Sequence, residues 1–296
     1  MFKNVIVGID GRGGGRDALA LAEALRGIGG ELTLVSVYPR EPFPWRGSSA
    51  AYEAVERNSA REVLERTRAE AGVQAQLRSH GSSSVGRGLH ELAEEIGADL
   101  LVLGSSRRGL VGRVLVGDDT RAALDGAPCA IAIAPCDYSQ HPDAMREIGV
   151  GYDGSPESEH ALAVARKLAS ERHTALSALE AVSLPAYTFA GPPIPDEGTI
   201  AELVQQAHER VEQLRDIEPH ATYGQPAEEL ALYSASLDLL VIGSRGYGPL
   251  GRLLHGSTAQ ELARSARCPL LVLTRADREV QSVPADGRAV ATPTTA

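Results

Sequence analysis

The sequence is poor in cysteine and in aromatic residues. Its 296 residues include three cysteines, Cys129, Cys136 and Cys268, which form neither a CxxC pair nor a spacing typical of a disulfide framework. Aromatic side chains make up 4% of the chain, too few to predict the stacking platforms on which proteins bind single-stranded nucleic acid. The cysteine usage indicates a reducing, cytoplasmic setting.

Long apolar runs and excess positive charge are also lacking. No segment approaches the ~18 consecutive apolar residues that span a bilayer. The start, Met1–Val7, enters a predicted strand directly and lacks a cleavable signal pattern. The formal net charge of −10 argues against a general polyanion binder. We therefore expect a globular protein that binds neither nucleic acid nor membranes, with a length sufficient for two domains.

One unit of sequence occurs twice. Val5–Gly11 recurs as Ile148–Gly154, and Ala98–Ser105 matches Leu237–Ser244 without a gap. A repeat of this length indicates a duplicated domain rather than a solenoid. The domains are predicted at residues 1–137 and 146–275, with a disordered tail rich in Pro, Thr, Ala and charge at 276–296.

Short apolar runs alternate with amphipathic stretches in each unit. Continuously apolar strands in such an alternation predict a parallel sheet covered on both faces. The fold class is therefore α/β, with two tandem doubly wound, Rossmann-like domains that each hold a five-stranded parallel sheet. In the first unit the predicted strands are 4–9, 31–37, 73–79, 100–103 and 130–134, and the predicted helices are 17–27, 51–71, 89–96 and 120–124.

Glycines are concentrated in the connection Gly243–Ser257, between a predicted strand and a predicted helix. The free N–H groups and the positive dipole end of that helix predict a phosphate site. Ligands of open parallel sheets bind outside the carboxyl ends of the strands, where Asp10 or Asp153 follows the first strand of its unit. Such a carboxylate can accept from a ribose hydroxyl or a base amine. The alternative role for Asp153 is a turn and helix cap.

The spacing Gly243-x2-Gly246-x9-Gly256-Ser257 resembles the nucleotide motif of the ATP-binding universal stress proteins, G-x2-G-x9-G-[ST]. Val150–Ala165 resembles the first strand and helix of that family, and the run that begins at Cys268 resembles its last strand. The resemblance covers essentially residues 1 to 275. It implies a tandem universal stress protein of the adenine nucleotide alpha hydrolase-like type.

The resemblance also implies roles for matching residues. Asp153 is expected to contact adenosine, backbone near Val182 to meet adenine, and Ser257 with Thr258 to bond phosphate oxygens, with ATP accompanied by Mg²⁺. For the two arginines of the loop, a solvated surface role is an equal alternative. The implied positions are Asp153, Gly154, Val182, Gly243, Arg245, Gly246, Gly248, Gly251, Arg252, Gly256, Ser257 and Thr258, with a weaker set of Asp10, Gly104, Arg107, Gly109, Gly112 and Gly117 in the first domain.

The first repeat departs from this motif at two positions. Arg107 stands where the second has Gly246, and Asp118 replaces Ser257. We expect Asp118 to act as the N-cap of its helix, and its fixed negative charge to repel a triphosphate. The opposing view is that Arg107, Arg108 and Arg113 form a basic cluster that keeps the site usable. The sequence thus predicts weak or no ATP binding in the first domain.

The function predicted from these observations is that of a nucleotide-responsive regulatory protein of stress tolerance, with ATP mainly in the second domain. No residue is predicted to be catalytic. The alternatives are an adenine-nucleotide hydrolase with slow ATP turnover, whose SGGxDS-like loop is absent here, and a scaffold that needs no nucleotide. The resemblance also implies association through the fifth strands, Ala130–Ala134 and Leu270–Leu273, both within the chain and in a homodimer.

Overall fold

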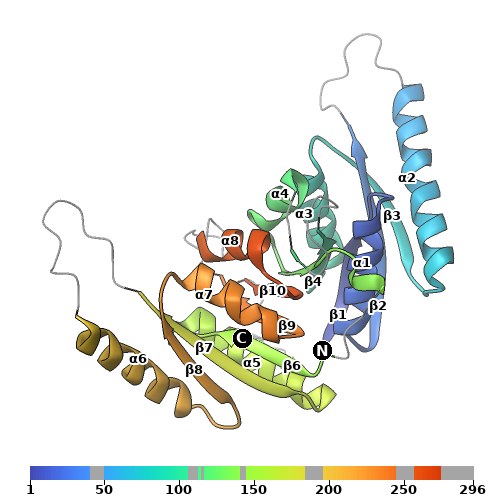
Figure 1. Cartoon of the computed structure of the whole chain (residues 1–296). Helices are drawn as coiled ribbons and strands as arrows, with labels where there is room; N and C mark the ends of the chain where they lie inside the picture. The colour runs from blue at the N-terminus through green and yellow to red at the C-terminus, as the bar shows by residue number, and fades with distance from the viewer. Residues whose placement is uncertain are drawn as a thin grey trace, which may run out of the picture.

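The computed structural model describes residues 1–40, 50–105, 113–114, 117–140, 145–183, 196–244 and 257–274. Two similar halves lie side by side along the sheet (Figure 1). The first half contains β1 (Phe2–Gly8), α1 (Gly13–Leu25), β2 (Arg26–Pro39), α2 (Ala50–Ala71), β3 (Gln76–Ser82), α3 (Val85–Ile96), β4 (Leu100–Gly104), α4 (Asp118–Leu124) and β5 (Ala130–Ala134).

A 3-10 turn, η1 (Tyr138–Gln140), lies between the halves. It is attached to α1 because the buried Asp17 carboxylate accepts from the backbone N–H groups of Asp137 and Ser139 at 3.0 and 2.9 Å, and from the Ser139 hydroxyl at 2.7 Å. The second half then contains β6 (Glu147–Gly151), α5 (Pro156–Arg172), β7 (Ala175–Val182), α6 (Glu197–Glu212), β8 (Glu218–Tyr223), α7 (Pro226–Tyr233), η2 (Ser234–Ser236), β9 (Leu239–Gly243), α8 (Ser257–Ser265) and β10 (Leu270–Leu273).

The strands form one ten-stranded sheet in the order β3-β2-β1-β4-β5-β10-β9-β6-β7-β8. All strand pairs within each half are parallel, which confirms the predicted doubly wound α/β fold with five parallel strands per unit. The halves join where β5 and β10 pair antiparallel, with Leu271 opposite Ala132. The fifth strands therefore associate within the chain, as expected.

The same pairing corrects one expectation. β5 lies between β4 and β10, and β10 lies between β5 and β9, so neither fifth strand offers a bare edge. A homodimer that pairs through Ala130–Ala134 or Leu270–Leu273 is excluded in this arrangement, because backbone groups already bonded to two neighbours cannot pair with a third strand.

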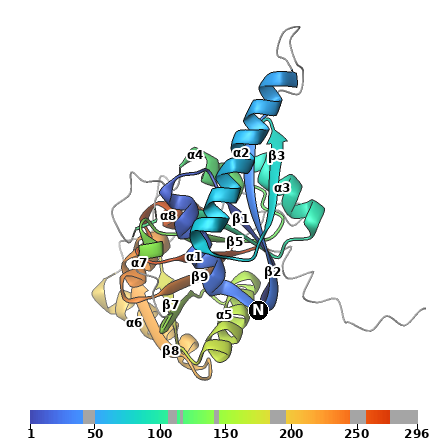
Figure 2. The same ribbon diagram turned by 90° about the vertical axis from the view of Figure 1, so that its right-hand side faces the viewer.

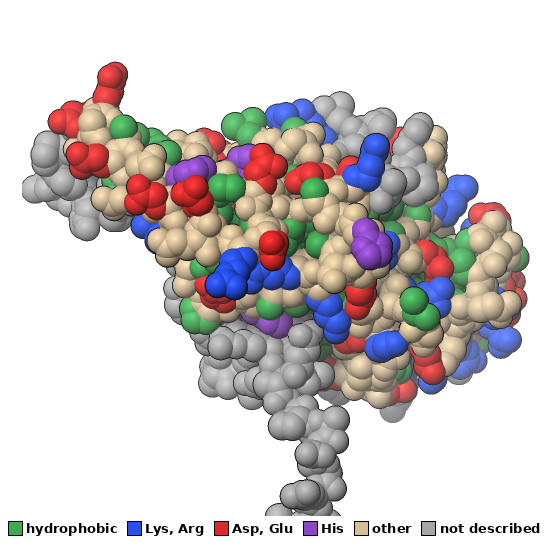
Figure 3. Space-filling view, turned by 90° about the horizontal axis from the view of Figure 1, so that it is seen from below, with side chains coloured by type: hydrophobic (Ala, Val, Ile, Leu, Met, Phe, Trp, Pro, Cys, Tyr) green, Lys and Arg blue, Asp and Glu red, His purple; other side chains and the backbone are tan. Residues whose placement is uncertain are grey.

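Helices cover both faces of the sheet (Figure 2), and the core on each face runs through both halves. One core includes Leu21 of α1 and Leu162 of α5, and the other includes Leu89 of α3 and Leu262 of α8. Within the described ranges, no helix combines the length and the apolar character of a membrane crossing. Acidic side chains gather over the end of the molecule that α6 forms (Figure 3).

Candidate functional site

Each half has a crevice at the carboxyl ends of its strands. The crevice of the first half, with a volume of about 290 Å³, is bordered by β1, β2, β4 and the start of α4. The crevice of the second half is larger, about 550 Å³, and is bordered by the corresponding β6, β7, β9 and the start of α8. This is where an open parallel sheet places its ligands.

The second crevice brings together four residues that the sequence placed in one site. Asp153 follows β6, Val182 ends β7, Gly243 ends β9, and Thr258 lies in the first turn of α8. Ser257 begins that helix, and Gly154 lies in the turn after Asp153. The remaining predicted positions of the loop lie outside the described residues: Arg245, Gly246, Gly248, Gly251, Arg252 and Gly256.

Asp153 and Gly154 form a tight turn that leads into α5. The Asp153 carboxylate accepts from the backbone N–H of Ser155 at 3.0 Å, and Gly154 has a φ of 71°, which favours glycine. Ser155 is the N-cap of α5, since its hydroxyl accepts from the N–H of Ser158. The turn-and-cap alternative is therefore realised, and Asp153 is also an exposed residue that borders the crevice.

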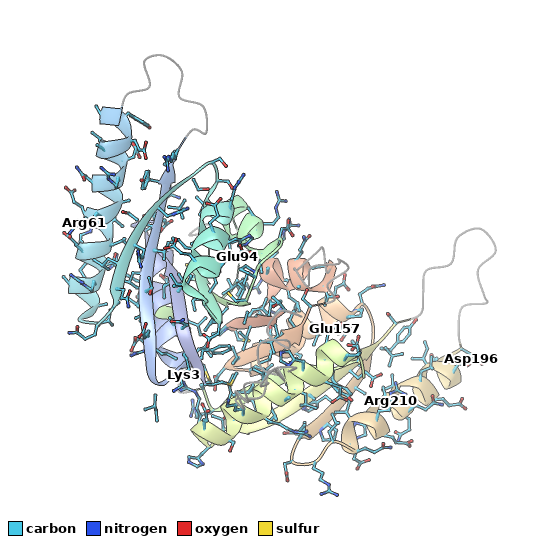
Figure 4. All side chains as sticks on the ribbon, turned by 180° about the vertical axis from the view of Figure 1, so that it is seen from behind. Lys3, Arg61, Glu94, Glu157, Asp196 and Arg210 are labelled. Atoms are coloured by element: carbon cyan, nitrogen blue, oxygen red, sulfur yellow. The ribbon has the colours of Figure 1, made fainter. Side chains whose placement is uncertain are left out.

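A buried carboxylate at the β7 end of the crevice was missed by sequence reasoning. Glu180 is 7% exposed and borders the crevice, and both of its oxygens accept from the Arg210 guanidinium on α6, at 2.5 and 3.2 Å. Figure 4 shows Arg210 on that helix. The available signal was a single charged residue in the apolar run Ala175–Val182, because a charge in a buried strand requires a partner.

Tyr152 lies beside Glu180 in the same crevice. Its hydroxyl donates to Glu159 of α5. Burial raises the pKa of Tyr152 to about 12, and the hydrogen bond to Glu159 and the negative charges of Glu159, Glu180 and Asp153 add to this effect. The tyrosine is therefore neutral at physiological pH, and this end of the crevice is rich in carboxylate.

Gly243 and Gly104 occupy equivalent places at the ends of β9 and β4. A Cβ atom on Gly243 would lie 2.3 Å from the carbonyl oxygen of Glu157 at the start of α5, a residue labelled in Figure 4. On Gly104 it would lie 1.9 Å from the carbonyl oxygen of Gly14 at the start of α1. Close helix–strand approach thus accounts for both glycines without any ligand.

The first crevice contains Asp10, Gly104 and Gly117 of the weaker predicted set, whereas Arg107, Gly109 and Gly112 lie outside the described residues. The Asp10 carboxylate accepts from the N–H of Arg12 at 2.9 Å, so it forms the same kind of turn as Asp153. The expectation that Asp118 is the N-cap is wrong by one residue. Gly117 has extended backbone angles and caps α4, and Asp118 is the first helical residue.

The fold and its crevices define a tandem, doubly wound α/β protein with a ligand-sized cavity at the carboxyl end of each half. The model of the universal stress protein family matches residues 1–135 and 145–274, so the chain belongs to the universal stress protein family. This confirms the resemblance found in the sequence.

Curated relatives agree with this assignment. A universal stress protein of Mycobacterium tuberculosis strain H37Rv is 35% identical over 182 residues, which cover 59% of this chain and 61% of the relative. The chain therefore spans less than two thirds of that relative's length. A universal stress protein of Mycolicibacterium smegmatis is 29% identical over 211 residues, 68% of each chain.

A solved structure has the same fold over nearly the whole chain. The crystal structure of a universal stress protein from Archaeoglobus fulgidus has a TM-score of 0.65 and 17% identity, and the match covers 92% of this chain and 98% of that one. At this level of identity the likeness concerns the fold alone.

Proposed function

We propose that the protein binds ATP, accompanied by Mg²⁺, in the crevice of the second half, and that it acts as a nucleotide-responsive regulatory protein of stress tolerance. The observation that carries the proposal is the meeting of Asp153, Val182, Gly243 and Thr258, from four separate stretches of chain, around one cavity of about 550 Å³. A cavity of this size lies within the range of roughly 300–1,000 Å³ typical of small-molecule sites.

The crevice suits a nucleotide because its two ends differ in charge. The start of α8 offers backbone N–H groups and the positive end of a helix dipole, which favour phosphate. Asp153 follows the neighbouring strand, where a negative ligand group would be repelled, and Glu180 on β7 is paired with Arg210. Within the described residues no cluster of three metal-binding side chains occurs. The Mg²⁺ is therefore expected to be held mainly by phosphate oxygens and water, as is usual for this ion.

The proposal takes residues 1–137 and 146–275 as the two domains and places the protein in the cytoplasm. A homodimer remains part of the proposal, on a surface other than the fifth strands, because their edges are used within the chain. Binding rather than hydrolysis is proposed.

The direct test is to identify, by mass spectrometry, any nucleotide released from the purified full-length protein and to titrate the protein with MgATP. Thr258→Ala is expected to weaken ATP binding by about 10- to 100-fold, because a hydrogen bond to a charged group contributes about 1.5–3 kcal/mol. Thr199→Ala, the same change in the first turn of α6, is the matched control and should leave the affinity unchanged. Absence of ATP binding by the wild-type protein would contradict the proposal.

A separate prediction concerns the first crevice. Wild-type protein is expected to bind about one ATP per chain, because Asp118 places a negative charge at the first residue of α4. Asp118→Ser should therefore raise the stoichiometry measured by calorimetry toward two. Equal saturation of both crevices in the wild-type protein, or no gain in the variant, would show that Asp118 does not control the first crevice.

A further inference from the structure

The buried carboxylate of Glu180 distinguishes the second crevice from the first. Gly8 and Gly151 are corresponding residues of the two repeats. Gly8 pairs with Val35 and Gly151 pairs with Leu179, so the next residues, Ser36 and Glu180, occupy equivalent places. Around the first crevice the β2 residues are the apolar Val35 and Val37. The charged group is therefore a property of one crevice and not of the shared fold.

The strand order places Glu180 at the end of the crevice that is farthest from α8. β9, which precedes α8 in the chain, lies next to β6, and β6 lies next to β7. Neighbouring strands are separated by about 4.8 Å, so β7 lies roughly 10 Å from β9 across the sheet. A nucleotide with its phosphates at the start of α8 would extend over Asp153 and bring its base to the end of β7.

The Glu180 carboxylate has a fixed position and a fixed hydrogen-bonding character. Two hydrogen bonds from the Arg210 guanidinium, one to each oxygen, hold it in place. An ionised carboxylate accepts hydrogen bonds and cannot donate them. It therefore attracts an amino group and repels a carbonyl oxygen at the same place on a base.

We propose that Glu180 is the specificity-determining residue of the second crevice, where it selects purine nucleotides that carry a 6-amino group over those that carry a 6-oxo group. The inference rests on the proposed function, since it assigns the base preference of that site. The backbone supplies less discrimination there, because the carbonyl of Val182 already accepts from the N–H of Gly224 at 3.0 Å. Ser36 gives the first crevice no comparable selector.

The test compares ATP with purine riboside triphosphate, which lacks the 6-amino group, and with inosine triphosphate, which carries a 6-oxo group and a proton on N1. Wild-type protein is expected to bind ATP at least about tenfold more tightly than inosine triphosphate, with purine riboside triphosphate between them, as expected for one charged hydrogen bond. Glu180→Gln should reduce the ratio between ATP and inosine triphosphate to less than about threefold, because its amide can donate as well as accept. Glu212→Gln, the same charge change at the exposed end of α6, should keep the wild-type ratio.

The outcomes separate the two proposals. If the Glu180→Gln protein does not fold, Glu180→Ser is the second variant, because serine is the residue at the equivalent position, Ser36, of the first half. It should also lose the preference for ATP over inosine triphosphate. ATP binding with no preference in the wild-type protein, or with the same ratio in the variants, would overturn the role of Glu180 and leave the proposed function intact. Failure of the wild-type protein to bind any of the three nucleotides would overturn both.

Discussion

Gly243→Ala is expected to lower the melting temperature of the protein whether or not nucleotide is present. The added Cβ would lie 2.3 Å from the Glu157 carbonyl oxygen, and a backbone atom at the start of a packed helix cannot move aside as a flexible side chain can. Overpacking of this kind costs about 1–3 kcal/mol, occasionally more. With about 2–4 °C per kcal/mol for a domain of 150–250 residues, a loss of roughly 2–12 °C is expected. Thermal unfolding followed by circular dichroism would measure it.

The first half provides a parallel variant and a control. Gly104→Ala should be at least as destabilising, because its Cβ would lie 1.9 Å from the Gly14 carbonyl oxygen. Gly117→Ala should cost less, since no heavy atom of the described residues lies within 4 Å of the added carbon and only the N-cap preference for glycine over alanine is lost. A Gly243→Ala protein as stable as the Gly117→Ala protein would refute the packing explanation. If the packing explanation holds, loss of ATP binding in a Gly243 variant is no evidence of direct contact.

Val272→Asp is expected to unfold both halves together. Val272 is fully buried in β10 opposite Ile131 of β5, within a core shared by the two halves. An unpaired carboxylate there carries a desolvation cost of several kcal/mol, a large part of the roughly 5–15 kcal/mol stability of a typical protein. We expect little folded protein, or a single unfolding transition at a strongly reduced urea concentration.

The control for this variant is Leu232→Asp on α7. Leu232 is 56% exposed, so the same charge should change the urea midpoint little. A Val272→Asp protein whose first half stays folded, detected as a protease-resistant fragment that begins at Met1, would show that the two halves are independent and contradict the prediction.

The sequence predicted the fold because the strands are continuous apolar runs, but it missed helix starts that contain glycine. α1 begins at Gly13 rather than at Asp17, and α3 begins at Val85 rather than at Leu89. Glycine lowers helix propensity, so both starts resembled loops. The packing of α3 against α4 requires glycine at position 86, because a Cβ there would lie 2.7 Å from the carbonyl oxygen of Ala122. A close contact between two segments that are far apart in the sequence cannot be predicted from the residues of one segment alone.

The site was predictable in its local motifs and not in its long-range pairs. Asp153–Gly154 follows an apolar strand in a recognisable turn, and the glycines after β9 have a fixed spacing. The Glu180–Arg210 pair joins a strand to a helix 30 residues later, and only the fold sets their distance. The N-cap error at Asp118 has a local cause, since glycine and aspartate are both accepted at that position.

The antiparallel junction of β5 and β10 allows the two crevices to evolve separately. Two identical subunits joined by a two-fold axis must carry every substitution in both sites at once. Here the pairing is between different segments of one polypeptide, so Glu180 could arise without a second copy at Ser36. The covalent link also makes the association of the two halves independent of protein concentration, because the halves cannot diffuse apart. Duplication within one chain thus lets the two sites change independently of each other.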